Sequence, residues 1–351
     1  MEETKKGFKL TNYIAIPTLL IIIFWVIVMI GGVLTNQELT TLLTDTIKRF
    51  GRWGILTLAM VPAIKSGTGP NFALPIGIVC GLLGVVCSFV LGFTGIGWFI
   101  AAVCLAIMFA SLAGFGYGKL LNAVKGSEMT IATYTGFSAT MLFCILWLIL
   151  PFKDTRITWP LSAQSGLRQF IPLDVIGSAQ VLDNFLAFRI FGIGIPTGML
   201  LVFFFACFLV WLFTRSKIGI AVAAGGSNPI FATAAGLNVD RGRIIANIVS
   251  TVLGAVGIIV YGQSFGFSQL YTDPLLMAFP AVAAILIGGA SVSKAKVTHV
   301  ILGTLLFQGI LTTTPPVAND LFPGTDLSET LRQIVQNGVI LFALMQAGGR
   351  K

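Results

Sequence analysis

The sequence YIAIPTLLIIIFWVIVMIGGVL occupies residues 13–34 and contains no charged side chain. A helix of about 20 apolar residues is long enough to cross the hydrocarbon core of a bilayer. Lys5, Lys6 and Lys9 precede the run, but it is too long for the apolar region of a signal peptide and has no clean cleavage site of small residues. These residues therefore predict a retained first membrane span.

The whole chain has the composition of a membrane protein. Of its 351 residues, 56% are hydrophobic and 10% are charged, whereas soluble domains have about 45–50% apolar and about 25% charged residues. So few charges could not cover the surface of a soluble protein of this size. The composition therefore argues against a soluble enzyme, a nucleic-acid-binding protein and a disordered chain. We interpret the net charge of +9 as a topology signal in the loops between spans.

Ten apolar segments are candidates for membrane spans, and they predict an all-α, polytopic membrane protein with about ten transmembrane helices. The segments lie at residues 13–34, 51–65, 72–91, 97–117, 129–150, 196–214, 244–264, 274–292, 298–315 and 331–347. The segment 51–65 is the weakest, because a helix of that length is shorter than the hydrocarbon core, which is about 30 Å thick.

Three interpretations of this weak segment are open. Its helix could begin earlier, with Asp45, Lys48 and Arg49 outside the hydrocarbon core. It could instead stop inside the membrane and leave residues 65–71 as irregular backbone beside a wet cavity. It could also join residues 72–91 as one broken span, which would reverse the orientation of everything after it.

The basic residues favour ten crossings with both termini in the cytoplasm. With ten crossings, every strongly basic segment falls on one side of the membrane, as the positive-inside rule requires. These segments are the N-terminal tail with Lys5, Lys6 and Lys9, the 215–243 loop, Lys294 and Lys296, and Arg350 and Lys351. The 153–189 loop, whose charges are mixed, then faces outward.

Glycine is unusually frequent, at 40 of 351 residues, and several glycines are spaced four residues apart in the predicted spans. Examples are the pairs Gly77/Gly81, Gly114/Gly118 and Gly262/Gly266. This spacing lets helix backbones approach closely in a membrane, so it predicts a tightly packed bundle.

The sequence contains no evident catalytic or metal-binding constellation. His299 is the single histidine, no two of the five cysteines are spaced CxxC, and residues 113–120 lack two of the residues that a phosphate-binding P-loop needs. We therefore expect no enzyme activity, metal or cofactor in this chain, and any ATP must be hydrolysed by another one. The predicted spans hold almost no carboxylates, which counts against an ion-coupled secondary carrier.

The 215–243 loop contains a short helix with clear boundaries. Asn228 is a good N-cap, Pro229 a good first helical residue and Gly236 a good terminator, so we predict a helix of about two turns here. A short helix of small residues outside the membrane fits a projection that docks into a partner. The alternative is a helix that lies on the membrane surface, but this one lacks the basic polar face that such helices favour.

Three motifs resemble those of ATP-binding-cassette (ABC) importer permeases of the ribose and simple-sugar type. The motifs are Gly-Gly-Ser-Asn at 225–228, Gly-Leu-Asn-Val at 236–239 and Ala-Val-Ala-Ala-Ile-Leu-Ile-Gly-Gly-Ala-Ser at 281–291. The likeness is good over residues 210–347 and looser in the N-terminal half. Asn71 stands where the sugar permeases usually carry an acid, and residues 293–296 replace a glycine-rich turn. These departures leave the identity of the solute open.

The resemblance implies a single permease domain over residues 1–351, built from two inverted four-helix repeats. Residues 13–214 would form the N-terminal half, 215–243 the cytoplasmic coupling loop and 244–347 the C-terminal half. The chain would be the permease subunit of an ATP-driven importer in the bacterial inner membrane. Its solute would be a small polar molecule, a simple sugar or, as the alternative, a nucleoside.

The resemblance also implies partners and candidate site residues. The partners would be ATP-binding subunits that hold ATP and Mg²⁺, a second permease copy or paralogue, and an extracytoplasmic solute-binding protein that docks on the 153–189 loop. The residues expected to couple to the ATPase are Gly226, Asn228, Pro229, Phe231, Ala232, Ala235 and Gly236. Those expected to line the translocation path are Asn71, Phe72, Gln263, Phe265, Phe267 and Gln269. Their amides and aromatic faces suit a neutral ligand that carries hydroxyl groups.

Overall fold

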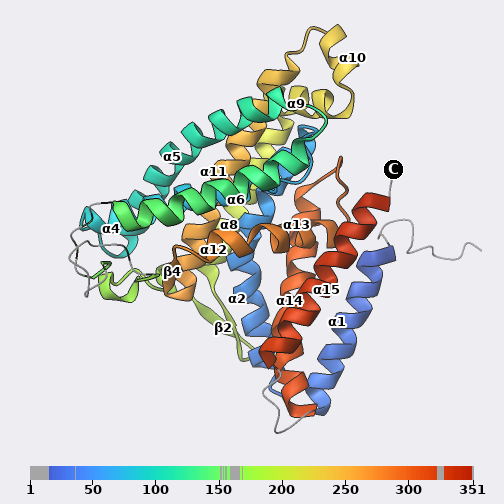
Figure 1. Cartoon of the computed structure of the whole chain (residues 1–351). Coiled ribbons are helices and arrows are strands. Elements are labelled where there is room, and N and C mark those ends of the chain that lie inside the picture. The colour runs from blue at the N-terminus through green and yellow to red at the C-terminus, as the bar shows by residue number, and fades with distance from the viewer. Residues whose placement is uncertain are drawn as a thin grey trace, which may run out of the picture.

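Helices form wherever the sequence carries a long apolar run, and they dominate this computed structural model (Figure 1). The structure describes residues 16–35, 37–150, 169–321 and 328–349, together with residues 152, 154, 156–158 and 167. The basic residues Lys5, Lys6, Lys9, Arg350 and Lys351 lie outside the described residues, as does most of the segment 153–168.

Each of the ten predicted segments overlaps a helix or two consecutive helices. The long helices are α1 (Ile16–Leu34), α2 (Leu39–Leu58), α4 (Leu74–Val90), α5 (Gly95–Ala123), α6 (Glu128–Ile149), α8 (Thr197–Arg215), α11 (Val239–Phe265), α14 (Val297–Leu321) and α15 (Ser328–Gly349). The shorter helices α3 (Met60–Lys65), α12 (Asp273–Leu276) and α13 (Ala278–Ile287) complete the set.

Five helices in the described part of the chain are long and apolar enough to cross a membrane, by length and composition. They are α5, α6, α8, α11 and α14. Three shorter apolar helices, over residues 18–34, 74–90 and 273–287, accompany them. The chain is therefore consistent with a polytopic helical membrane protein, and the count of ten crossings stays a prediction.

The weak second segment is longer than predicted. Helix α2 begins at Leu39 rather than at residue 51, because Leu42, Thr46 and Phe50 form a buried stripe at four-residue spacing on an otherwise polar helix. The helix is interrupted after Leu58, where the ring of Pro62 removes the N–H that would bond to the Leu58 carbonyl. The early start expected as one alternative is thus correct.

Irregular backbone separates α3 from α4, as another of the alternatives expected. Residues 66–73 form no regular helix, yet Ser66, Thr68 and Asn71 are buried in protein. Irregular backbone at membrane depth is tolerated only where protein surrounds it or where it lines a cavity, so this burial is compatible with a helix that ends inside the membrane. Helices α3 and α4 are therefore two helices joined by an irregular loop, and whether they count as one broken span stays a prediction.

Helix α11 packs against α4 and α5 at the centre of the fold. A Cβ atom on Gly77 would collide with the carbonyl oxygen of Thr251, and one on Gly118 would lie 2.9 Å from the Cα of Ile244. These two glycines confirm the predicted close approach of helix backbones. The third predicted pair behaves differently, because Gly262 faces the side chain of Ser268 and Gly266 ends α11 with a φ of 93°.

The expectation of an entirely helical chain misses four short strands. Strand β1 (Phe170–Pro172) pairs antiparallel with β4 (Phe267–Gln269), and β2 (Phe188–Ile190) pairs with β3 (Ile193–Ile195). A 3₁₀ turn (Asp174–Ile176) and the short helix α7 (Val181–Asn184) lie between β1 and β2. The described part of the predicted outer loop is thus a folded layer over the end of α11.

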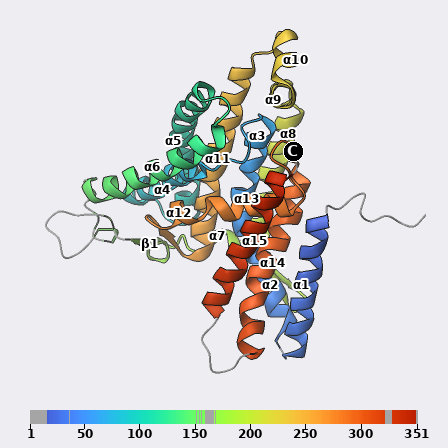
Figure 2. The same ribbon diagram turned by 45° about the vertical axis from the view of Figure 1, so that its right-hand side comes forward.

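Two further helices, α9 (Lys217–Ser227) and α10 (Pro229–Ala234), project at the other end of α11. Figures 1 and 2 both show α10 beyond the ends of α5 and α11. In both views the first described turn of α1 and the last turn of α15 point towards this same end. The described ends of the chain are therefore directed towards the same end of the helix bundle as α10.

Candidate functional site

Helix α10 has the boundaries that its sequence predicts. The side chain of Asn228 accepts a hydrogen bond of 3.0 Å from the backbone N–H of Phe231, and Pro229 opens the helix. Gly236 has a φ of 79°, and the N–H of Leu237 donates to the carbonyl of Ala232 at 3.0 Å. These are the N-cap and the glycine-terminated C-terminus expected of a short, locally specified helix.

The surface of α10 carries exposed apolar side chains. Ile230 is 83% exposed and Phe231 is 70% exposed, whereas Ala232 is fully buried. Asn228, Pro229, Ala235 and Gly236 are exposed as well. Five of the seven predicted coupling residues are thus exposed, and Ala232 lies on the side of α10 that is buried against the rest of the protein.

Gly226, the remaining coupling residue, lies in α9 and contacts the irregular backbone after α3. A Cβ atom at position 226 would collide with the carbonyl oxygen of Lys65 and lie 2.7 Å from the backbone N of Gly67. Gly67 has a φ of 79°, and its own Cβ would lie 2.9 Å from the Cα of Gly226. The two glycines therefore bring α9 into direct backbone contact with the α3–α4 loop.

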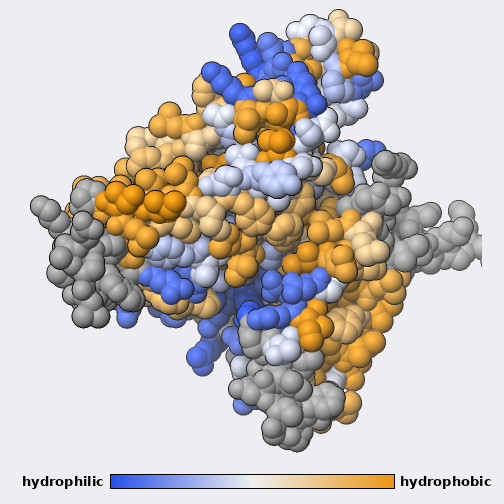
Figure 3. All heavy atoms as spheres, in the orientation of Figure 1, coloured by the Kyte–Doolittle hydropathy of each residue, from blue (hydrophilic) through white to orange (hydrophobic). Residues whose placement is uncertain are grey.

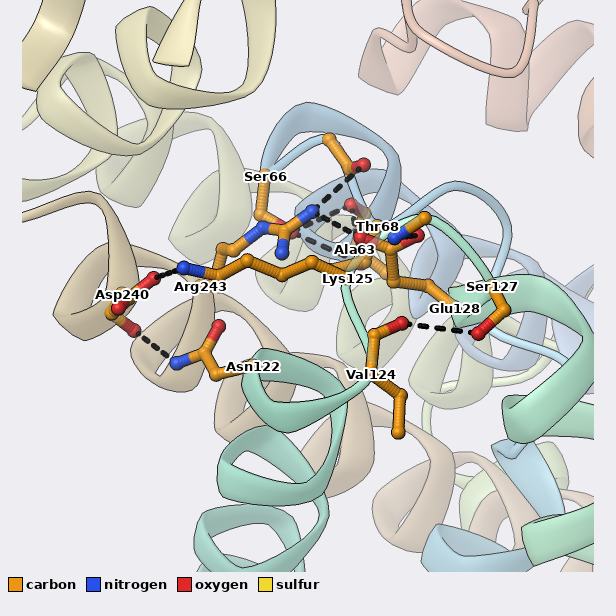
Figure 4. A network of polar contacts seen from close by, with 12 residues as sticks. Ala63, Ser66, Thr68, Asn122, Val124, Lys125, Ser127, Glu128, Asp240 and Arg243 are labelled. Carbon is orange, nitrogen blue, oxygen red and sulfur yellow. Dashed lines mark hydrogen bonds and ion pairs between the residues drawn. The ribbon is translucent and has the colours of Figure 1, made fainter. Parts of the chain in front are cut away.

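Polar side chains tie the start of α11 to the turn between α5 and α6 (Figure 4). The Arg243 guanidinium forms an ion pair of 2.6 Å with Glu128, and both side chains are largely buried, at 11% and 14% exposure. Lys125 pairs with Asp240 at 2.7 Å, and the amide of Asn122 donates to the Asp240 carbonyl at 2.9 Å. The start of α11 is thus fastened to the end of α5 and the start of α6.

Sequence reasoning counted Arg243 as one of several loop charges and did not single out Glu128. The Arg243 guanidinium also lies 3.5 Å from the carbonyl oxygen of Gly67. Arg243 therefore contacts the same α3–α4 loop that Gly226 contacts. The position of Glu128 in the first turn of α6 was the available signal, because a carboxylate at the end of an apolar helix needs a partner when it is buried.

The predicted path residues fall into two groups. Phe265 and Gln269 line a cavity of about 1020 Å³, and Phe267 packs on the Phe265 ring with centroids 4.7 Å apart. Gln263 lies two residues before Phe265 in α11, but its amide is fully buried and bonds to the backbone of Leu182 and Val260.

Asn71 and Phe72 belong to the α3–α4 loop, away from this cavity's lining. The Asn71 amide donates to the Ser250 hydroxyl at 2.8 Å and accepts from the N–H of Ala73 at 3.0 Å. Phe72 packs against the ring of Phe279. Both side chains fasten the α3–α4 loop to its neighbours.

The cavity lies between α2, the end of α11, the α12–α13 segment, α14 and α15. Figure 3 shows hydrophilic atoms gathered below α12 on this face, with hydrophobic atoms on both sides. Its wall carries the aromatic residues Trp53 and Tyr261, whose ring centroids are 5.6 Å apart. Sequence analysis did not identify this wall because Trp53 in α2 and Tyr261 in α11 lie far apart in the sequence.

A protein-family model described as the permease component of a branched-chain amino acid transport system matches residues 42–344. The chain belongs to this permease family. The match covers most of the chain, including the coupling loop and the cavity. No solved structure matches the permease significantly.

Three curated relatives align with parts of the permease. The nucleoside ABC transporter permease protein NupB of Lactococcus lactis is 23% identical over 224 residues, which is 63% of this chain and 57% of NupB. The xylose/arabinose import permease protein XylH of Sulfolobus acidocaldarius is 33% identical over 109 residues, 30% of each chain. The probable ABC transporter permease protein YphD of Escherichia coli is 28% identical over 153 residues, 44% of each chain. Each alignment thus spans less than two thirds of the relative.

Proposed function

We propose that this permease is the transmembrane subunit of an ATP-driven, binding-protein-dependent importer for a small polar solute. The observation that carries the proposal is α10, a capped helix that projects beyond the bundle and exposes Ile230 and Phe231. Exposed apolar side chains on a rigid projection are typical of a protein-binding surface. We assign this surface to a separate ATP-binding subunit that holds ATP and Mg²⁺.

In the proposed mechanism, closure of the ATPase subunits moves α10, and the motion reaches the bundle through two contacts. One is the backbone contact of Gly226 with the α3–α4 loop, and the other is the Arg243–Glu128 ion pair at the start of α11. Both contacts join elements that pack around the centre of the fold. The bundle then alternates between outward-open and inward-open states, a rigid-body form of gating.

The proposed arrangement places α10 and both termini in the cytoplasm of a bacterial cell, with about ten crossings of the inner membrane and two inverted repeats. The shared side of α10, the start of α1 and the end of α15 supports this orientation. The folded layer that includes β1 and α7 would face outward and receive the solute-binding protein. A second permease copy or a paralogue would complete the path.

The proposed solute is a simple sugar, and a nucleoside is the alternative. The names of XylH, a xylose/arabinose import permease, and NupB, a nucleoside permease, support these two classes. The aromatic wall of the cavity suits either one, because sugar rings and bases both pack on aromatic faces.

The proposal is tested by mild-detergent purification of the tagged permease from its native host, followed by mass spectrometry and an ATPase assay. We expect a stoichiometric ATPase with a Walker motif and ATP hydrolysis in the eluate. A permease that is recovered alone and inactive in several detergents, in cells whose uptake follows an ion gradient, would contradict the proposal.

A further inference from the structure

Gln308 lies near the middle of α14, which is one of the helices long and apolar enough to cross a membrane. Its side chain is only 1% exposed, yet its amide nitrogen donates to no residue that the structure describes. Such an amide destabilises an apolar bundle, because it has lost its hydrogen bonds to water and has gained none within the protein. Gln308 is therefore a candidate for binding a group that the chain itself does not supply.

Gln308 belongs to the wall of the 1020 Å³ cavity. The residues of α14 that line this cavity lie at positions 308, 311, 312, 315 and 316, so one face of the helix is turned towards it. The hydroxyl of Thr304, one turn earlier on α14, is also buried without a partner among the described residues, but Thr304 does not belong to this wall. The unpaired amide of Gln308 thus adjoins a space large enough for a solute.

Asp273 and two aromatic rings supply complementary groups in the same cavity. The Asp273 side chain is 7% exposed and forms no ion pair within the described part of the chain. One of its carboxyl oxygens accepts from the backbone N–H of Gln269 at 3.2 Å, which leaves further capacity to accept hydrogen bonds. Trp53 and Tyr261 add their aromatic rings. A donor, an acceptor and an aromatic face are what a ring that carries hydroxyl groups requires.

The charged side chains around the cavity do not select an ion of one sign. A neighbouring cavity of about 650 Å³ shares Asp45, Lys48 and Arg52 with it. Among the described residues, the two walls carry five cations and four acids, namely Lys48, Arg49, Arg52, Arg189 and Arg332, and Glu38, Asp45, Asp183 and Asp273. Asp45 attracts Arg49, and Asp183 faces Lys48 and Arg52. These walls of mixed charge suit a neutral polar solute.

We propose that Gln308 binds the imported solute, and that this solute is a neutral ring compound recognised through its hydroxyl groups. The Gln308 amide donates to one hydroxyl oxygen, the Asp273 carboxyl group accepts from another hydroxyl, and the ring packs on the aromatic wall. A solute without the first hydroxyl leaves the amide unpaired, so this contact also sets specificity. The inference rests on the proposed import function and assigns recognition to a residue outside the six path residues expected from the sequence.

Sugars and ribonucleosides both carry ring hydroxyl groups, so the test includes both. The permease, purified with its ATPase and separated from any solute-binding protein, is placed in nanodiscs of phosphatidylcholine. Calorimetry measures the binding of ribose, xylose, glucose and uridine, and then of the monodeoxy analogues of the compound that binds most tightly. Because no solute-binding protein is present, any selectivity belongs to the permease complex itself.

Gln308→Met removes the amide and keeps a straight side chain of similar size. We expect it to weaken solute binding about fivefold or more, the usual effect of losing a hydrogen bond at a buried site. The thermal midpoint should not fall, because the variant removes an unpaired polar group from an apolar interior. Thr304→Val is the matched control, since it removes another unpaired polar group of α14 away from the cavity wall, and it should leave binding unchanged.

The monodeoxy analogues test direct contact. We expect at least one of them to bind the parent about fivefold or more weakly than the intact solute. The same analogue should bind Gln308→Met about as well as the intact solute does, because the lost hydroxyl and the lost amide belong to one hydrogen bond.

Three results would overturn the inference. These are parent-like solute binding by Gln308→Met, strictly additive losses for every monodeoxy analogue, and no binding of any of the four compounds to the parent. Failure of the ATPase to co-purify would instead contradict the proposed function. An ATPase that co-purifies with a permease insensitive to Gln308→Met would leave the importer proposal intact and reject the assignment of Gln308.

Discussion

Gly226→Ala should uncouple the permease from its ATPase, whereas Gly225→Ala should not. The two glycines are neighbours in α9, and neither requires a left-handed backbone. They differ in what an added methyl group would meet. At position 226 it would meet the backbone of residues 65–67, and at position 225 it would meet only the side chain of Val239, at 3.3 Å.

The size of the effect follows from these distances. A methyl carbon at position 226 would lie 2.7 Å from the backbone N of Gly67, and an ordinary contact is about 3.5 Å or longer, so α9 and the loop must separate by roughly 0.8 Å or more. Overpacking of this kind costs about 1–3 kcal/mol. Alanine recovers roughly 0.5–1 kcal/mol through its helix preference. A net loss of about 1–2 kcal/mol at this contact corresponds to a decrease in coupling of about 5- to 30-fold.

The assay compares both variants in cells and as purified complexes. We expect Gly226→Ala to co-purify with the ATPase, because α10 is unchanged, but to reduce solute-stimulated ATP hydrolysis and uptake several-fold. Gly225→Ala should stay within about twofold of the parent in both assays, because a valine side chain can move. Thermal midpoints of the purified complexes separate a loss of coupling from a loss of folding. Normal uptake by a stably folded Gly226→Ala variant would refute the proposed route through the α3–α4 loop.

Three other predictions test separate parts of the structure. Phe231→Ala should weaken ATPase binding roughly 30-fold, the effect of removing a central interface aromatic. Its thermal midpoint should not change, because the side chain is 70% exposed; a retained ATPase in pull-downs would contradict this. Arg243→Gln should lower the free energy of unfolding by about 3 kcal/mol by leaving the buried Glu128 carboxylate unpaired. Adding Glu128→Gln should recover part of that loss, and strictly additive effects in denaturation would argue against the pair. Burial raises the pKa of Asp183 in α7, and this desolvation outweighs the hydrogen bond from Ser264. Since the folded state then holds the proton more tightly than the unfolded state, stability should rise as the pH falls from neutral through the folded pKa. Asp183→Asn should flatten that rise, and an unchanged pH profile of the thermal midpoint would contradict the assignment.

The features that the sequence predicted well are those that local interactions specify. Helix α10 follows from Asn228, Pro229 and Gly236, which lie within nine residues of one another and act on their own backbone. The apolar helices follow from hydropathy alone, since lipid-facing surface needs no particular partner. The first half of α2 was expected only as one of several alternatives, because its buried stripe of Leu42 and Phe50 lies among polar residues and hydropathy does not reveal it.

Features that depend on residues far apart in the sequence could not be predicted. The amide of Asn71, which is a predicted path residue, bonds to Ser250, 179 positions later, and no local pattern indicates this contact. The cavity brings Arg49 of α2 together with Arg332 of α15, and no periodicity in either helix indicates the other. Strand β1 likewise pairs with residues that follow α11.

Site-specific crosslinking tests the central claim most directly, namely that α10 is the surface on which an ATPase acts. A photoreactive phenylalanine analogue would replace Phe231 on α10. In the control it would replace Phe191, which lies in the turn between β2 and β3 and is 95% exposed. The account predicts that mass spectrometry identifies a Walker-motif ATPase in the adduct from position 231 and not in that from position 191. Adducts at position 231 that contain only lipid, or no partner chain, would contradict it.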